Sequence, residues 1–205
     1  MREFIIHGRG GQGAQTAGNL LARAYFACGH QVQAFATYGG ARRGTPVSSF
    51  LRVADQPIRL RCDIERADAI LCFDASLLEG RLLATAHAQT RILVNSAHSV
   101  AHYAQLLPGY QVMPLDGLAI SRQHGLGRIV NSALLGAFAR MLTDVPSCCA
   151  LRYSPLGRPG VLMAPPLAVL AHVLAEQLPE LCDENVAACA EGFRRVDEQL
   201  SALAL

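Results

Sequence analysis

Two kinds of spacing between hydrophobic and polar positions recur along the chain. Short apolar runs predict strands at residues 4–7, 31–37, 69–73, 91–95 and 110–113. Apolar residues that recur every three or four positions predict helices over residues 14–28, 77–88, 129–142, 167–177 and 184–200. Because strands and helices alternate, the pattern predicts helices packed on both faces of a largely parallel sheet.

One antiparallel feature interrupts this alternation. The runs at 47–53 and 58–60 flank Ala54-Asp55-Gln56-Pro57, a turn-forming sequence, and are predicted to form a hairpin. The expected fold is therefore an α/β, three-layer α/β/α sandwich with a mostly parallel, Rossmann-like sheet and an antiparallel hairpin at one side. A length of 205 residues suits one domain spanning 1–205. The proline- and glycine-rich stretch 153–166 is predicted to be a loop.

Charge changes this picture at the N-terminal end. All 18 basic residues are arginine, so a P-loop lysine and any Schiff-base mechanism are excluded. No acidic residue occurs between Glu3 and Asp55. That stretch contains Arg9, Arg23, Arg42, Arg43 and Arg52. We therefore expect a locally cationic region that binds an anionic ligand or an acidic partner surface, whereas the net charge of +2 does not favour nucleic-acid binding.

The cysteines and the chain ends exclude several classes of protein. The seven cysteines are scattered, with no C-x-x-C pair, so neither a metal site nor an iron–sulfur cluster is expected in this chain. The adjacent Cys148 and Cys149 invite a redox role, but buried free thiols are the default expectation. No apolar run is long enough to span a membrane and no signal peptide is legible, which predicts a cytoplasmic protein without a membrane partner.

A glycine-rich loop is the first candidate site. Gly8, Arg9, Gly10, Gly11, Gln12 and Gly13 lie between the first predicted strand and the first predicted helix. The G-x-G-x-x-G spacing matches the dinucleotide-binding pattern, in which backbone N–H groups at a helix start face a phosphate. NAD-binding folds also place an acid after the second strand, but Phe35-Ala36-Thr37 stands there. An NAD-dependent enzyme is therefore disfavoured.

Two interpretations of this loop stay open. The glycines could serve only a tight turn and close packing of the helix on the sheet, with Gln12 bonded to nearby backbone. Alternatively, the loop contacts a phosphate-bearing ligand or a partner subunit. A free-standing nucleotide-binding protein would use it in the second way.

A basic loop is the second candidate. Arg42 and Arg43 lie between Tyr38-Gly39-Gly40 and Gly44, and a guanidinium group suits paired contacts with carboxylates or phosphates. Because loops that follow parallel strands share one edge of a sheet, this loop is expected to face the glycine loop. Solvated surface charge is the alternative interpretation.

Other polar residues carry weaker signals. His7 on a buried strand is expected to be a core histidine, while Asp74 and Asn95-Ser96 end strands and either bind a ligand or cap the next helix. His98 and His102 are four residues apart but lack a third metal ligand. We expect no catalytic residue in this chain, because no nucleophile–base arrangement is legible.

Two linked segments resemble the gamma subunit of pyruvate:ferredoxin oxidoreductase and its 2-oxoacid relatives. The first runs from Ile6 to Ala14 and continues through Thr16-Ala17 to Leu20-Leu21-Ala22. The second comprises Tyr38-Gly39, Arg42 to Val47 and Phe50 to Ile58. Weaker similarity covers 128–137 and 185–192. Where family members usually have Pro-Glu, this chain has Gly40-Ala41.

The resemblance implies a subunit of a complex that converts a 2-oxoacid, with pyruvate as the first expectation, and coenzyme A to acyl-CoA and passes electrons to ferredoxin. The complex is expected to use thiamine diphosphate, Mg²⁺ and [4Fe-4S] clusters, none of them in this chain. Its partners would be alpha and beta subunits, with a delta subunit in some assemblies, and a homodimer is allowed for the isolated chain. This chain would complete the assembly, help to bind coenzyme A and be inactive by itself.

Overall fold

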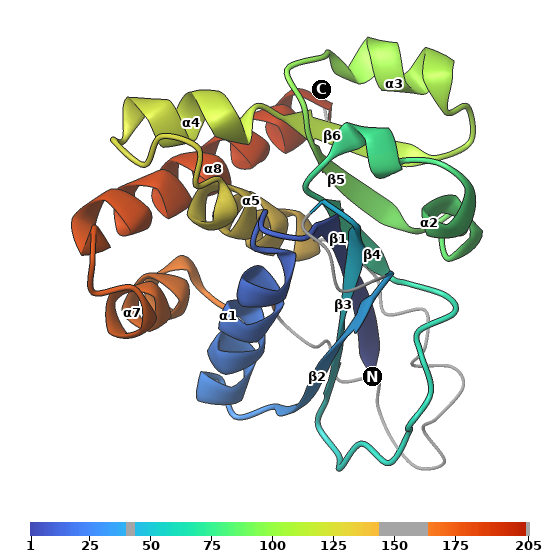
Figure 1. Cartoon of the computed structure of the whole chain (residues 1–205), viewed down its shortest axis with the longest axis horizontal. Helices are drawn as coiled ribbons and strands as arrows, with labels where there is room; N and C mark the ends of the chain where they lie inside the picture. Colours follow the sequence, from blue (N-terminus) through green and yellow to red (C-terminus); the bar gives the residue numbers. More distant parts are fainter. Residues whose placement is uncertain (40–43, 144–163, 204–205) are drawn as a thin grey trace.

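The computed structural model describes residues 1–39, 44–143 and 164–203, which form a six-stranded mixed sheet flanked by helices (Figure 1). The strands are β1 (Arg2–Arg9), β2 (Gln31–Tyr38), β3 (Pro46–Ala54), β4 (Ala69–Cys72), β5 (Arg91–Asn95) and β6 (Gln111–Leu115). The helices are α1 (Ala14–Ala27), the 3-10 turn η1 (Ala75–Leu77), α2 (Gly80–Ala84), α3 (Val100–Leu106), α4 (Gly117–Gln123), α5 (Asn131–Leu142), α7 (Leu167–Gln177) and α8 (Cys182–Leu203).

The strand order is β2-β3-β1-β4-β5-β6. Strands β1, β4, β5 and β6 are parallel, while β3 is antiparallel to both β1 and β2. The predicted α/β sandwich with an antiparallel pair at one side is confirmed. The predicted strand at 58–60 is wrong, because residues 57–61 have no strand structure and side chains of β2 and β3 bond to carbonyls between 60 and 62. Gln33 Nε2 donates to Leu60 O at 2.8 Å, and Arg52 Nη1 donates to Cys62 O at 2.8 Å.

Alternating strand residues build two hydrophobic cores, one on each face of the sheet. Phe4 and Ile6 point to a large core shared with α1, α5, α7 and α8, and Ile5 points to the opposite core. The second layer is thinner, and its largest predicted helix, 77–88, is only η1 and the five-residue α2. Leu78 and Leu82 of this region still cover the sheet. The periodic pattern predicted the helices on the face of the large core well, but it predicted too long a helix on the opposite face.

Helices α5 and α8 cross at very close range. A Cβ atom placed on Gly136 would lie 1.9 Å from Cys189 O, and one on Gly192 would lie 2.0 Å from Ala133 O. Only glycine allows these two backbones to approach so closely. The C-terminal end of α5 is held by the buried Arg2, whose Nη1 donates to Leu142 O at 3.0 Å. Within the described ranges, no helix has the length and apolar character needed to cross a membrane.

Candidate functional site at the carboxyl edge of the sheet

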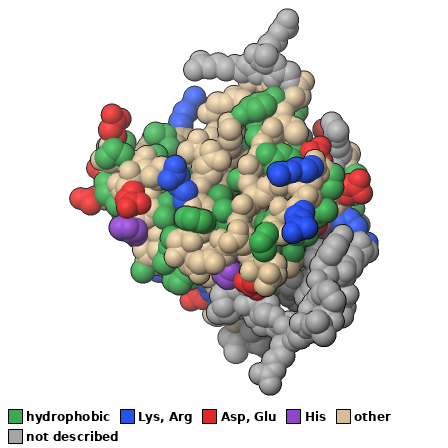
Figure 2. All heavy atoms as spheres, turned by 90° about the horizontal axis from the view of Figure 1, so that it is seen from below, with side chains coloured by type: hydrophobic (Ala, Val, Ile, Leu, Met, Phe, Trp, Pro, Cys, Tyr) green, Lys and Arg blue, Asp and Glu red, His purple; other side chains and the backbone are tan. Residues whose placement is uncertain are grey.

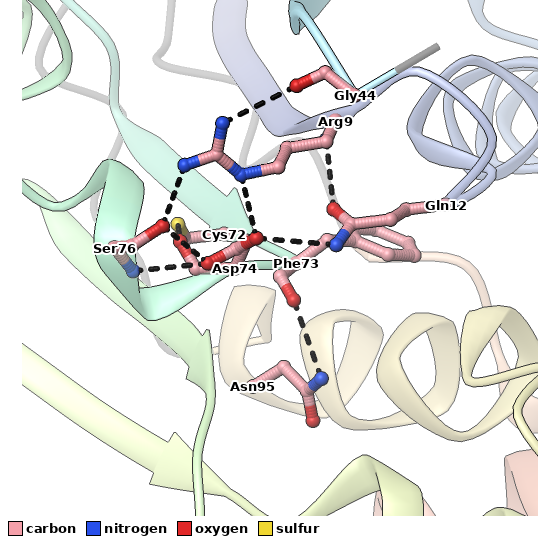
Figure 3. A network of polar contacts seen from close by, with 8 residues as sticks. All are labelled: Arg9, Gln12, Gly44, Cys72, Phe73, Asp74, Ser76 and Asn95. Carbon is pink, nitrogen blue, oxygen red and sulfur yellow. Dashed lines mark hydrogen bonds and ion pairs between the residues drawn. The ribbon is translucent and has the colours of Figure 1, made fainter.

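The candidate site lies where β1 and β4 end, beside the start of α1 (Figure 3). Both β1 and β2 are antiparallel to β3, so they run in the same direction and end at one edge of the sheet. The glycine loop after β1 therefore touches the end of the loop after β2. Gly10 N donates to Thr45 O at 2.9 Å, and Gly44 N donates to Gly10 O at 3.2 Å. Arg42 and Arg43 themselves lie outside the described residues.

Arg9 is engaged inside this edge and does not extend into solvent as a free charge. Its Nε donates to Asp74 Oδ2 at 2.9 Å, its Nη2 to Ser76 Oγ at 2.8 Å, and its Nη1 to Gly44 O at 3.2 Å. The acid that neutralises Arg9 comes from the end of β4, 65 residues further along the chain (Figure 3). Arg9 thus ties together three segments that the sequence separates.

Gln12 and Asp74 complete this network. Arg9 N donates to Gln12 Oε1 at 2.7 Å, and Gln12 Nε2 donates to Asp74 Oδ2 at 3.2 Å. Ser76 N and Ser76 Oγ donate to Asp74 Oδ1 at 3.1 and 2.6 Å. Partial burial acts to raise the pKa of Asp74, but the hydrogen bonds from Ser76, Gln12 and Arg9 outweigh it and hold that pKa below its usual value. Asp74 therefore both caps η1 and orients Arg9 as a carboxylate.

The glycines of the loop have different tasks. A Cβ atom on Gly8 would lie 3.0 Å from Ala14 Cβ, so Gly8 permits close packing of the loop on α1. Gly11 and Gly13 adopt left-handed backbone angles, with φ of 94° and 88°. A Cβ atom on Gly11 would meet nothing within 4 Å, whereas one on Gly13 would lie 2.3 Å from Asn131 Nδ2. Gly11 is consequently the open point of the loop.

The start of α1 offers unpaired backbone donors. Its first internal bond is made by Ala17 N to Gly13 O, and no described residue accepts from the N–H groups of residues 13–16. Helix α5 begins at Asn131, directly against Gly13, so two helix N-termini meet here. Neither helix has an acidic residue in its first turn or a side-chain cap. The two helix dipoles therefore make this point favourable for a negatively charged group.

Several other predicted residues are structural. Ser48 Oγ lies 2.8 Å from His7 Nδ1, and burial lowers the pKa of His7 to about 4, so its imidazole is neutral at pH 7. Asn95 joins two segments, because its Nδ2 donates to Phe73 O at 3.2 Å and its Oδ1 accepts from Gly117 N at 3.0 Å. His98 and His102 stack with centroids 4.2 Å apart.

The thiols show no reactive setting among the residues described. Cys72 and Cys189 are buried, and burial raises the pKa of each to about 12. Cys148 and Cys149 lie outside the described residues. Nowhere in 1–39, 44–143 or 164–203 do three His, Cys, Asp or Glu side chains gather as metal ligands would.

Ser76 and Asn131 had no predicted role. Ser76 lies two residues after a strand-ending aspartate, which is the spacing of a capping turn, so its bond to Asp74 could have been expected. Asn131 begins a periodic helical segment, but nothing in the sequence indicates that this helix starts against Gly13.

Comparison with known proteins gives this arrangement a family. The family model for pyruvate ferredoxin/flavodoxin oxidoreductase matches residues 3–195. Pyruvate synthase subunit PorC of Methanocaldococcus jannaschii is 39% identical over 140 residues, covering 68% of this chain and 76% of that protein. The common gamma subunit of the pyruvate/ketoisovalerate oxidoreductases of Thermococcus kodakarensis is 39% identical over 145 residues, covering 68% and 77%.

The solved structures agree with these relatives. The crystal structure of pyruvate oxidoreductase subunit PORC from Thermotoga maritima superimposes with a TM-score of 0.73 at 26% sequence identity, covering 94% of this chain and 95% of that one. The expected resemblance is thereby confirmed, and the free-standing nucleotide-binding protein is not favoured. The chain belongs to the pyruvate ferredoxin/flavodoxin oxidoreductase family.

Proposed function

We propose that this chain is the gamma subunit of a 2-oxoacid:ferredoxin oxidoreductase, with pyruvate as the first candidate substrate. The observation that carries the proposal is the 39% identity, over 68% of the chain, to proteins named as PorC and gamma subunits of such enzymes. In this proposal, residues 1–205 form one gamma-type domain that acts in the cytoplasm. It assembles with alpha and beta subunits, and with a delta subunit where one exists, and reaches ferredoxin only through the complex.

The reaction chemistry is assigned to the other subunits. The complex would use thiamine diphosphate, Mg²⁺ and [4Fe-4S] clusters, but the described residues of this chain do not fit any of these groups. Carboxylates, thiols and imidazoles do not gather in threes in the described ranges, and the two fully buried thiols, Cys72 and Cys189, have strongly raised pKa values.

The start of α1, by contrast, fits a phosphate or a partner carboxylate. Its N–H groups at residues 13–16 have no acceptor among the described residues, and Gly11 leaves the approach to them open. Within the glycine loop, Gly8, Arg9, Gly10 and Gln12 hold the shape, while the backbone at Gly11 and Gly13 faces the anion. Arg42 and Arg43, which the adjoining loop carries, would supply charge-assisted contacts to coenzyme A phosphates or to an acidic partner surface.

Such a site would bind and position its ligand without itself reacting. A helix start binds a phosphate oxygen through neutral backbone donors, and the guanidinium groups add long-range attraction that steers an anion to the edge. Asp74 would keep Arg9 turned into the loop and away from the ligand. Among the described residues, the edge offers no group placed to exchange a proton with a substrate.

Expression of the chain alone and with the other subunits of its complex tests the proposal. We expect the isolated chain to be colourless and unable to reduce methyl viologen with pyruvate and coenzyme A. The assembled complex should show iron–sulfur absorbance, and should reduce methyl viologen only when this chain is included. Substituting other 2-oxoacids identifies the substrate. Iron–sulfur absorbance in the isolated chain, or full activity of a complex that lacks it, would contradict the proposal.

A further inference from the structure

The outer edge of β2 is unusually open for a sheet of this size. Strand β2 is eight residues long, contains no charged residue and no proline, and pairs with β3 in an unbroken register from Gln31↔Ala54 to Tyr38↔Val47. Proteins normally block such edges with charges, prolines, bulges or very short strands. The opposite edge follows this rule, since β6 has five residues, includes Pro114 and packs against α3 and α8.

The register identifies which backbone groups face outward. Gly39 N donates to Pro46 O, so every second residue before it, from Thr37 back to Gln31, is hydrogen-bonded to β3. The residues in between, Val32, Ala34, Ala36 and Tyr38, direct their N–H and C=O groups away from β3. No described residue forms a backbone hydrogen bond to them on that side.

A groove beside this strand supplies side-chain contacts. It has a volume of about 570 Å³ and lies between the exposed side of α1, Val32 of β2 and the end of α7 at Leu178. Phe26 lines it and is 69% exposed. Arg23 also lines it, is exposed, and has no hydrogen-bond or ion-pair partner among the described residues. Glu176, on the nearby α7, instead pairs with His172 at 3.3 Å.

The surroundings of Arg23 are deficient in negative charge. Neither α1 nor β2 contains an acidic residue, and the sequence has none between Glu3 and Asp55. Viewed from below, the face at this end of the molecule has arginines and exposed hydrophobic side chains on either side of its centre, and its acidic side chains lie mostly toward the margins, some of them beside arginines (Figure 2). A complementary partner would therefore carry carboxylates and apolar side chains.

We propose that the open edge of β2 receives an extended, acidic segment of another subunit of the oxidoreductase, which adds a strand to the sheet and places alternate side chains in the groove at Phe26 and Arg23. Main-chain bonds would supply affinity and the groove would supply selectivity. A second copy of this chain fits less well, because its β2 offers no carboxylate and its Arg23 would lie near the Arg23 of the first copy, placing two positive charges together. The inference rests on the proposed function, which supplies the partner.

Ala34→Pro tests the backbone part. Proline removes the outward N–H of Ala34 and fills its place with the ring, but costs no bond to β3. Ala34→Ser, which keeps the N–H, is the matched control. When the full chain is titrated into the other subunits, we expect Ala34→Pro to weaken assembly by at least about tenfold, and Ala34→Ser to assemble as wild type.

Arg23→Glu tests the charge, with Arg122→Glu on α4, which packs against α5 and α8 and not against β2, as the control. Arg23→Glu should weaken assembly at low salt by about tenfold, with a smaller difference at high salt, and Arg122→Glu should not. Residue-resolved hydrogen exchange on the wild type checks the added strand without a mutation. The N–H groups of Val32, Ala34 and Ala36 should become protected only in the complex, whereas those of Gln33, Phe35 and Thr37 are protected throughout.

Several outcomes would overturn the proposal while leaving the subunit assignment intact. These are wild-type assembly by a folded Ala34→Pro variant, unchanged exchange at Val32, Ala34 and Ala36 in the complex, or protection of these groups already in the monomeric chain. Protection that rises with concentration of the free chain, together with a dimer in sedimentation, would make a second copy the occupant. If the wild-type chain does not join the other subunits at all, both the subunit assignment and this inference fail.

Discussion

At the scale of single residues, the carboxyl edge combines rigid and open positions. Arg9, Gln12 and Asp74 are bonded to one another, so they hold the glycine loop in one shape. Gly11 and Gly13 differ only in what surrounds them, since both have positive φ but only Gly13 has a neighbour in the way of a side chain. This difference separates the cost of backbone strain from the cost of a clash.

Gly13→Ala should destabilise the chain more than Gly11→Ala. Each variant forces a non-glycine residue into the left-handed region, at about 1–2 kcal/mol. Gly13→Ala also drives Cβ into the Asn131 amide, which we expect to add about 1–3 kcal/mol. Urea unfolding of both variants measures the difference.

Asn131→Ala provides the control for that comparison. Combined with Gly13→Ala it should recover the clash part of the loss but not the strain part, and combined with Gly11→Ala it should recover nothing. Equal destabilisation by Gly11→Ala and Gly13→Ala would show that Asn131 does not rest on Gly13 in solution.

Arg52, one of the arginines of the expected cationic region, is part of the core. It is 1% exposed, and its Nε donates to Glu3 Oε1 at 2.7 Å. Its Nη1 reaches Gln33 Oε1 and Cys62 O, at 2.9 and 2.8 Å. A buried charge is tolerated only when paired and fully hydrogen-bonded, and these contacts meet that condition. Arg52 thereby fastens the segment after β3 to the second face of the sheet.

At the scale of elements, the crossing of α5 and α8 is the tightest contact in the helical layer. Gly136→Ala should lower the free energy of unfolding by about 3 kcal/mol, because the added Cβ meets a backbone carbonyl that no rotamer change can move. For a chain of this size that corresponds to a decrease in Tm of roughly 6–12 °C. Calorimetry or thermal circular dichroism measures it.

Gly18→Ala is the matched control for this crossing. Its Cβ would lie 2.2 Å from Ser49 Oγ, a side-chain atom, so the second substitution Ser49→Ala should restore most of the lost stability. At Gly136, trimming the facing side chain by Cys189→Ala should restore little, because the carbonyl remains. Full rescue of Gly136→Ala by Cys189→Ala would refute the backbone-contact argument.

At the scale of the whole molecule, two surfaces are proposed to bind a ligand or a partner, the carboxyl edge and the open edge of β2. Arg42→Ala combined with Arg43→Ala tests the first in the reconstituted complex. Loss of charge-assisted contacts should either weaken assembly or raise the KM for coenzyme A. The lost binding free energy should be about 2–5 kcal/mol if the contacts are desolvated, and under about 1 kcal/mol if they are exposed. The deficit should be largest at low salt.

The same double variant distinguishes the two ligands proposed for that edge. A higher KM with normal assembly would assign the arginines to coenzyme A, and weaker assembly with a normal KM would assign them to a partner subunit. If assembly and KM both stay at wild-type values at low salt, the arginines are solvated surface charges. Arg122→Glu again controls for a general effect of lost positive charge.

Sequence periodicity alone was sufficient for much of the fold. The strands β1, β4 and β5 and the helices α1, α5 and α7 match their predicted ranges within a few residues. In a buried strand or an amphipathic helix, the local order of apolar and polar residues indicates which positions are buried. The glycine loop was equally visible, because a tight strand-to-helix turn requires glycine at particular positions.

Only the tertiary structure decided which of these segments meet. The sequence placed an antiparallel partner of β3 at 58–60, but the structure pairs β3 with β1 and β2. The acid that neutralises Arg9 comes from a strand end 65 residues away. Short helices such as α3 and α4 were missed because seven residues carry too little periodicity to be recognised. Strand pairing and the ion pair share one physical reason: the partners are chosen by shape and burial across the whole sheet, and no local pattern records that choice.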